Sequence, residues 1–65
     1  MIKIGNYYTR LDLLSEYIKL YVKYITEDYI PCSTLDENGN LIMSLVDRSS
    51  FDNIISELTR MEYNK

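Results

Sequence analysis

The segment from Thr9 to Thr26 constrains the fold of this chain most, because a helix made from it is apolar on two sides. At about 100° per residue, its polar side chains collect in one sector. Its apolar side chains form two adjacent stripes that span roughly 200° together, about twice the width of the stripe on a one-sided surface helix. The first stripe contains Leu11, Leu14, Ile18, Tyr21, Val22 and Ile25, and the second contains Leu13, Tyr17, Leu20 and Tyr24. One stripe can face the protein's own core, so the other must be buried by some other surface.

We predict that the second stripe is a dimer or partner interface. Leu13, Tyr17, Leu20 and Tyr24 follow one another at intervals of four, three and four residues, which is the spacing of a helix-pairing seam. Tyrosine suits an interface because its ring can be buried while its hydroxyl stays hydrated or hydrogen-bonded. The alternative is that this small fold wraps the helix on both sides by itself.

The chain has 65 residues, which corresponds to one small domain over residues 1–65. A domain of this size buries only about 60% of the surface of its unfolded chain, so its stability margin is thin. Cys32 is the only cysteine and there is no histidine, which excludes an intramolecular disulfide and an ordinary zinc site. Because oligomerisation is the remaining common device, we expect a homodimer through the second stripe.

After the first helix, the sequence predicts a β-hairpin. Two short runs, Tyr29–Leu35 and Leu41–Val46, favour strands and flank the dipeptide Asn38-Gly39, the strongest short-range hairpin signal. If this dipeptide is a two-residue loop, Leu35 lies opposite Ile42. Pro31 lacks an N–H and suits the start of an edge strand.

The remaining segments complete a small α+β domain. Phe51 to about Glu62 has a single apolar stripe, typical of a helix lying on a sheet, and Met1 to Ile4 allows a short additional strand at the N-terminus. Thr9 with Asp12 three residues later resembles a capping box, which places the start of the first helix at about Thr9. We therefore expect the order α-β-β-α, with two helices around a central β-hairpin.

The composition argues against an enzyme. Without histidine, the chain lacks the usual general base at neutral pH and every Ser-His or Cys-His nucleophile pair. Asp36, Asn38 and Asn40 have the spacing of ligands in a calcium-binding loop, but Leu41 stands where such a loop requires glycine. We therefore expect no catalytic residue, no cofactor and no metal site.

Charge is distributed unevenly along the chain. Residues 1–25 carry four basic and two acidic side chains, whereas residues 26–65 carry three basic and eight acidic ones. This chain lacks the basic stripe of a duplex-binding protein, which argues against direct nucleic-acid binding. Its acidic half either keeps the protein in solution or competes for a basic groove on another protein. The candidates for such partner binding are Asp36, Glu37, Asp47, Asp52, Glu57 and Glu62.

By elimination, the sequence predicts a small protein that binds a larger protein and blocks it as a regulator or inhibitor. This short, acidic, histidine-free and tyrosine-rich chain resembles the host-takeover proteins of bacteriophages in size and composition. The resemblance implies an inhibitor of a host cytosolic protein. The acidic half adds a slight preference for a target that normally holds nucleic acid, which the chain would replace as a DNA mimic.

Two alternative functions remain. A small DNA-binding transcriptional regulator would use Arg48 and Arg60, and a structural or assembly subunit would use the apolar helix. The single cysteine and the lack of a signal peptide indicate the reducing cytoplasm, which is the host's if a phage encodes the chain. We expect no membrane segment, because Glu16, Lys19 and Lys23 interrupt the most apolar stretch.

Overall fold

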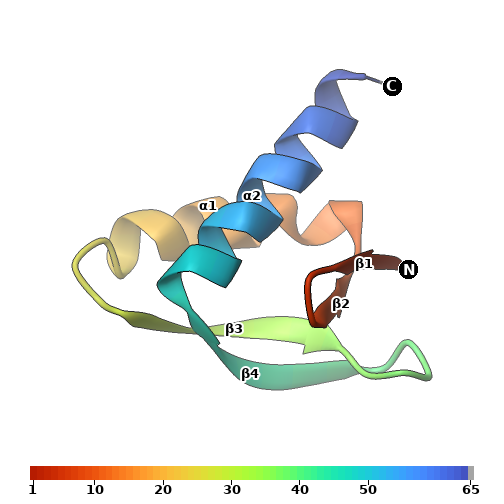
Figure 1. Ribbon diagram of the computed structural model, residues 1–65, viewed down its shortest axis with the longest axis horizontal. Coiled ribbons are helices and arrows are strands. Elements are labelled where there is room, and N and C mark those ends of the chain that lie inside the picture. Colours follow the sequence, from red (N-terminus) through yellow and green to blue (C-terminus); the bar gives the residue numbers. More distant parts are fainter. Residues whose placement is uncertain (65) are drawn as a thin grey trace.

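In a computed structural model that describes residues 1–64, the chain forms a four-stranded antiparallel sheet with two helices on one of its faces (Figure 1). The strands lie side by side in sequence order. The elements are β1 (Ile2–Ile4), β2 (Tyr7–Thr9), a 3-10 turn (Leu11–Leu13), α1 (Leu14–Lys23), β3 (Tyr29–Leu35), β4 (Leu41–Asp47) and α2 (Arg48–Tyr63). The predicted α+β class is therefore confirmed, together with both helices and both strands of the central hairpin.

An additional hairpin precedes the first helix. β1 pairs with β2, with Ile2 opposite Thr9 and Ile4 opposite Tyr7. Gly5 turns the chain between them with a φ of 60°, a left-handed conformation that glycine adopts at little cost. The short N-terminal strand is confirmed, whereas its partner β2 was not predicted.

The first helix begins close to the predicted start, but the prediction that Thr9 caps it is wrong. Thr9 ends β2 and is buried, and its hydroxyl lies 2.6 Å from the Tyr17 hydroxyl. The helix begins after Arg10 as a 3-10 turn, in which the Leu13 N–H donates to the Arg10 carbonyl at 3.1 Å, and continues as α1. Because the Thr9 hydroxyl is used inside the molecule, it is not available as a helix cap.

The β3–β4 hairpin has a register one residue away from the predicted one. Leu35 lies opposite Leu41 and not opposite Ile42. The loop therefore contains the three residues 37–39 between the bonded residues 36 and 40, and not the two residues expected from Asn-Gly.

The Asp36 carboxylate favours this longer loop. Its Oδ1 accepts the backbone N–H groups of Asn38 and Asn40, both at 2.9 Å. The Asp36 carbonyl accepts the Gly39 N–H at 3.0 Å, and Gly39 follows with a φ of 83°. A turn followed by a left-handed glycine is the common three-residue hairpin loop, so the local side-chain bonds decide the register.

Pro31 lies inside β3 and not at the start of an edge strand. β3 is an interior strand, but β2 pairs with it only through Tyr8 and Leu35, so β2 does not extend as far as Pro31. On its other side Pro31 lies opposite Leu45 of β4. The missing N–H of Pro31 points toward the side that β2 leaves open, so it breaks no ladder bond.

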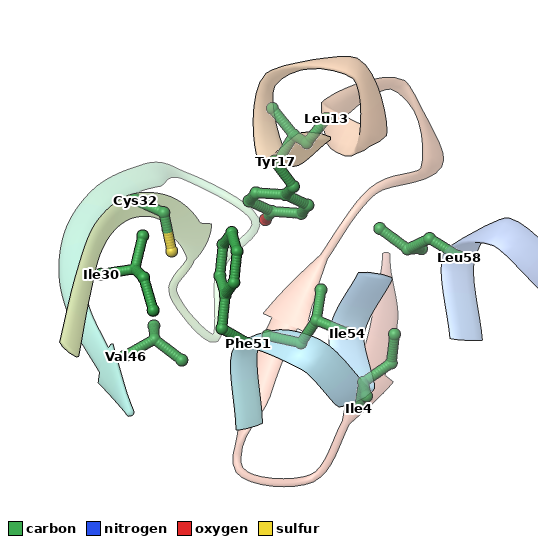
Figure 2. Packing of buried hydrophobic residues seen from close by; sticks show 9 residues of the cluster. All are labelled: Ile4, Leu13, Tyr17, Ile30, Cys32, Val46, Phe51, Ile54 and Leu58. Carbon is green, nitrogen blue, oxygen red and sulfur yellow. The ribbon is translucent and has the colours of Figure 1, made fainter. Parts of the chain in front are cut away.

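The core lies between the sheet and the two helices (Figure 2). The rings of Tyr17 and Phe51 meet edge to face, with centroids 5.9 Å apart. The buried cluster consists of Ile4, Leu13, Tyr17, Ile30, Cys32, Val46, Phe51, Ile54 and Leu58. The burial of Phe51, Ile54 and Leu58 confirms the single apolar stripe predicted for the second helix.

Candidate functional site

The two apolar stripes of the first helix have the opposite roles from those predicted. The second stripe consists of Leu13 and Tyr17, which are buried, and Leu20 and Tyr24, which are half-buried and packed against the core. The first stripe faces solvent over much of its length. The assignment of Leu13, Tyr17, Leu20 and Tyr24 to an interface is therefore wrong, because these side chains pack inside their own molecule.

Tyr17 shows why this assignment fails. Its hydroxyl lies 2.6 Å from the Thr9 hydroxyl and donates to the Ser33 carbonyl at 2.7 Å. Burial raises the pKa of Tyr17 above its ordinary value, and the hydrogen bond with Thr9 opposes this shift. The amphipathic ring that suggested an interface thus finds its polar partners within the core.

The exposed part of the first stripe is here called the helix surface and consists of Ile18, Tyr21, Val22 and Ile25. All four side chains are exposed, Val22 by 66% and Ile25 by 59%. Helical spacing places Ile18, Tyr21 and Val22 on one side of α1, and Ile25 lies in the turn that follows the helix. The Arg48 guanidinium lies 5.6 Å from the centre of the Tyr21 ring, at the edge of the patch. Apolar patches of this kind mark interaction sites on small proteins.

A second uncovered patch lies on β4 and is here called the strand surface. It consists of Leu41, Met43 and Leu45, which are 56%, 73% and 66% exposed. Alternate residues of a strand point to the same face, so these three lie together on the face that the helices leave bare. The sequence gives no signal for this patch, because residues 41–46 are apolar on both faces of the strand except at Ser44.

The six predicted acidic partner-binding residues do not form one site. They are Asp36 and Glu37 at the hairpin loop, Asp47 and Asp52 at the start of α2, and Glu57 and Glu62 further along α2. The loop lies at the lower end of the view in Figure 1, and the end of α2 lies at its upper end. The carboxylates are therefore spread over the molecule.

Local partners lie beside Asp36, Asp47, Asp52 and Glu57. Hydrogen bonds, chiefly from the Asn40 N–H, hold the pKa of Asp36 below its ordinary value. Asp47 caps α2 by accepting the Ser50 N–H at 3.1 Å, and its bonds with Ser50 lower its pKa most. Asp52 lies 3.8 Å from an Arg48 nitrogen, and Glu57 pairs with Arg60. These contacts within the chain explain the positions of the four acids, so no binding partner is needed to account for them.

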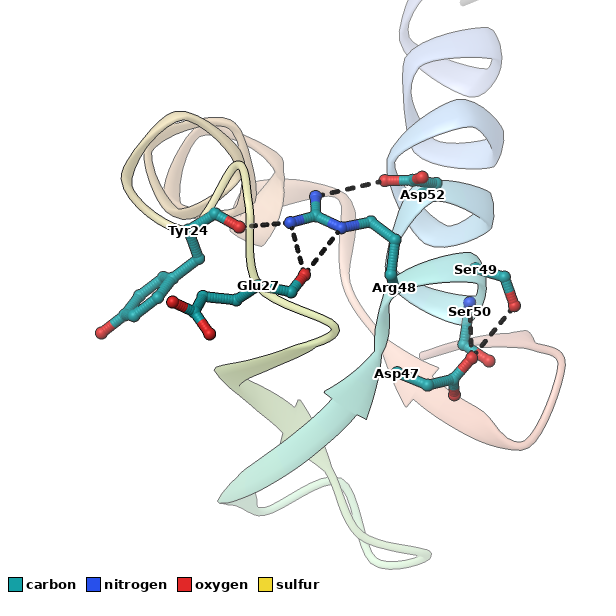
Figure 3. A network of polar contacts seen from close by, with 7 residues as sticks. All are labelled: Tyr24, Glu27, Asp47, Arg48, Ser49, Ser50 and Asp52. Carbon is teal, nitrogen blue, oxygen red and sulfur yellow. Dashed lines mark hydrogen bonds and ion pairs between the residues drawn. The ribbon is translucent and has the colours of Figure 1, made fainter.

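Arg48 joins the end of the first helix to the start of the second (Figure 3). Its Nε and one terminal nitrogen donate to the Glu27 carbonyl at 3.1 and 2.8 Å, and the same terminal nitrogen donates to the Tyr24 carbonyl. These carbonyls lie at and just after the end of α1, where backbone acceptors lack helical partners. The alternative of a DNA-binding regulator would use Arg48 as a contact, whereas its guanidinium is occupied by these bonds.

Other kinds of site are absent from the part of the chain that the structure describes. Residues 1–64 contain no pocket and no group of three potential metal ligands. Among the same residues, every buried side-chain nitrogen and oxygen has a hydrogen-bond partner. No helix within this range has the length and apolar character needed to span a membrane.

A scan of protein-family models and searches of curated proteins and of solved structures found no match for this chain. The helix surface and the strand surface are therefore the candidate binding sites of this chain.

Proposed function

We propose that this chain is a non-enzymatic protein-binding regulator or inhibitor that blocks a larger protein by covering part of its surface. The exposure of the helix surface carries this proposal. Ile18, Tyr21, Val22 and Ile25 form an apolar centre, and Lys19 and Lys23 are exposed beside it. An apolar, aromatic centre with a charged rim is the usual composition of a protein interface.

The proposed place of action is the cytoplasm, that of a bacterial host if a phage encodes the chain. The buried free thiol of Cys32 is consistent with a reducing compartment. The size and acidic composition of the chain support the comparison with phage inhibitors.

A capture experiment with matched variants tests the proposal. The native chain is immobilised in a bacterial lysate beside two double variants, Ile18→Glu with Val22→Glu on the helix surface and Ser15→Glu with Thr26→Glu on the polar side. Each variant adds two carboxylates near α1, at exposed positions. We expect the native chain and the polar-side control to retain the same partner, and the helix-surface variant to lose it. Equal retention by all three chains, or no specific partner, would contradict the proposal.

Competition for a nucleic-acid-binding surface is a narrower form of this proposal. Glu37, Asp52, Glu57 and Glu62 can be neutralised to Gln or Asn, whereas Asp36 and Asp47 stay because they hold the loop and the helix cap. If mimicry is correct, this variant binds the captured partner more weakly, and native binding weakens as salt rises, because exposed charges are screened over about 8 Å at physiological ionic strength. A flat salt response would assign recognition to the apolar helix surface.

The two alternative functions differ in their support. The bonds of Arg48 to backbone carbonyls and the pairing of Arg60 with Glu57 argue against a DNA contact by these two residues. A structural or assembly role is supported by the strand surface, which offers a site for self-association away from the buried second stripe of α1.

A further inference from the structure

We propose that the free edge of β4 pairs with β4 of a second copy of this chain, antiparallel and centred on Met43, so that two four-stranded sheets become one. β4 is the last strand of the sheet and lies along the lower rim of the view in Figure 1, with no other element beyond it. This inference is independent of the proposed partner binding, because it uses the strand surface and not the helix surface.

The backbone of β4 presents its free donors and acceptors at Leu41, Met43 and Leu45. Two bonds bracket the β3–β4 ladder: Asp36 N–H to the Asn40 carbonyl at 2.9 Å, and Arg48 N–H to the Asp28 carbonyl at 2.8 Å. In an antiparallel ladder, bonded pairs alternate with unbonded pairs, so the even-numbered residues of β4 bond to β3. The odd-numbered residues 41, 43 and 45 therefore direct their N–H and C=O groups toward the open edge.

A two-fold axis at Met43 matches these groups with one another. It places Met43 opposite Met43 of the second copy, and Leu41 opposite its Leu45, on both sides of the axis. Each of these pairs can exchange two backbone hydrogen bonds. The same pairing brings the exposed Leu and Met side chains of the two copies together on the outer face.

The lack of charge on β4 favours a second copy of this chain as the partner at the free edge. No charged residue lies between Leu41 and Val46, although the chain has a net charge of −3. Edge strands that avoid self-pairing usually carry a lysine, a proline or a bulge, and this segment contains none of them. The opposite edge is protected, because β1 has only three residues and contains Lys3. Pairing of β4 with itself thus uses the one long free edge of each copy, and the assembly stops at a dimer.

The size of the contact indicates a weak, reversible dimer. A standard interface buries roughly 800 Å² on each partner, and one strand edge with three apolar side chains offers on the order of half of that. Contacts in this class are transient, so we expect dissociation constants in the micromolar range or weaker.

Sedimentation equilibrium from micromolar to millimolar concentration tests this pairing. The variants are Met43→Lys, which places like charges opposite each other at the axis, and Val22→Lys, which adds the same charge on the helix surface. Met43 and Val22 are similarly exposed, at 73% and 66%, so neither change enters the core. We expect Met43→Lys to weaken self-association by about tenfold or more and Val22→Lys to associate as the native chain does.

Amide hydrogen exchange locates the contact in the native chain. The amides of Leu41, Met43 and Leu45 should become protected as concentration rises, while those of Ile42 and Ser44 are protected by β3 at every concentration. A native chain that stays monomeric at millimolar concentration would overturn the proposal. So would a dimer that Val22→Lys removes and Met43→Lys leaves intact, or growth into species larger than a dimer.

Discussion

The Tyr17 hydroxyl joins α1 to two strands of the sheet. Its only proton goes to the Ser33 carbonyl, so the Thr9 hydroxyl must be the donor in the bond between Thr9 and Tyr17. Thr9 lies in β2 and Ser33 in β3, at the point where the two strands begin to separate. One buried hydroxyl therefore fixes the position of the helix over the sheet.

Removal of this hydroxyl should destabilise the protein. Tyr17→Phe keeps the ring against Phe51 but leaves the Thr9 hydroxyl and the Ser33 carbonyl without their buried partner. We expect a loss of about 1–3 kcal/mol in the free energy of unfolding, measured by urea denaturation. The control is Tyr21→Phe at an exposed position, which should change stability by less than about 0.5 kcal/mol. Equal effects of the two substitutions would contradict the role given to Tyr17.

The buried thiol of Cys32 should make stability fall at alkaline pH. Burial raises the pKa of Cys32 from 9.0 to about 11, so the folded chain keeps this proton at pH values where the unfolded chain loses it. Stability is then fully present below pH 9.0 and is lost as pH rises toward about 11. We expect Cys32→Ala to lose less stability than the native chain over this range, in parallel urea titrations. Parallel losses in the two chains would show that another group is responsible, with Tyr17 as the next candidate.

Among the elements, the central hairpin depends on the backbone conformation of Gly39. Its φ of 83° lies in the left-handed region, and a Cβ there would meet no atom within 4 Å. The cost of Gly39→Val therefore comes from the backbone, and we expect a loss of roughly 1–3 kcal/mol in the free energy of unfolding. Gly39→Asn should cost less, because asparagine tolerates this conformation. If the valine variant melts at the native temperature, the loop geometry described for residues 36–40 is incorrect.

Sequence patterns identified the elements more reliably than their ends and registers. The strands Tyr29–Leu35 and Leu41–Asp47 follow from apolar runs beside Asn-Gly, and α2 follows from one clear stripe. β2 was missed because its residues, Tyr7–Thr9, do not alternate between apolar and polar, and Thr9 was assigned to the cap of the first helix. The hairpin register depends on side-chain bonds of Asp36, which a dipeptide signal does not contain.

The orientation of α1 could not be predicted from its own residues. Both stripes are apolar and contain tyrosine, so the helix pattern alone permits either stripe to face inward. Contacts with distant segments decide between them, since Thr9, Ser33 and Phe51 surround Tyr17. The sequence therefore shows that both stripes are apolar, but it does not show which of them is exposed to solvent.

At the scale of the whole molecule, the two helices cover one face of the sheet, and the core covers one side of α1. Both helices lie on the same face of the sheet, and the core fills the space between them. The opposite face of the sheet retains the strand surface, and the outer side of α1 retains the helix surface. Because the two patches are separate, the proposed self-association and the proposed partner binding do not exclude each other.

Thermal unfolding followed by circular dichroism tests directly which side of α1 faces the core. Tyr17→Glu with Leu20→Glu should unfold the chain, because it buries a charge in the core. Ile18→Glu with Val22→Glu changes the same helix by the same two charges and should keep a near-native melting temperature, since both positions are exposed. The opposite result, a folded inner variant and an unfolded outer one, would show that the helix packs through Ile18 and Val22 and would remove the helix surface as a binding site.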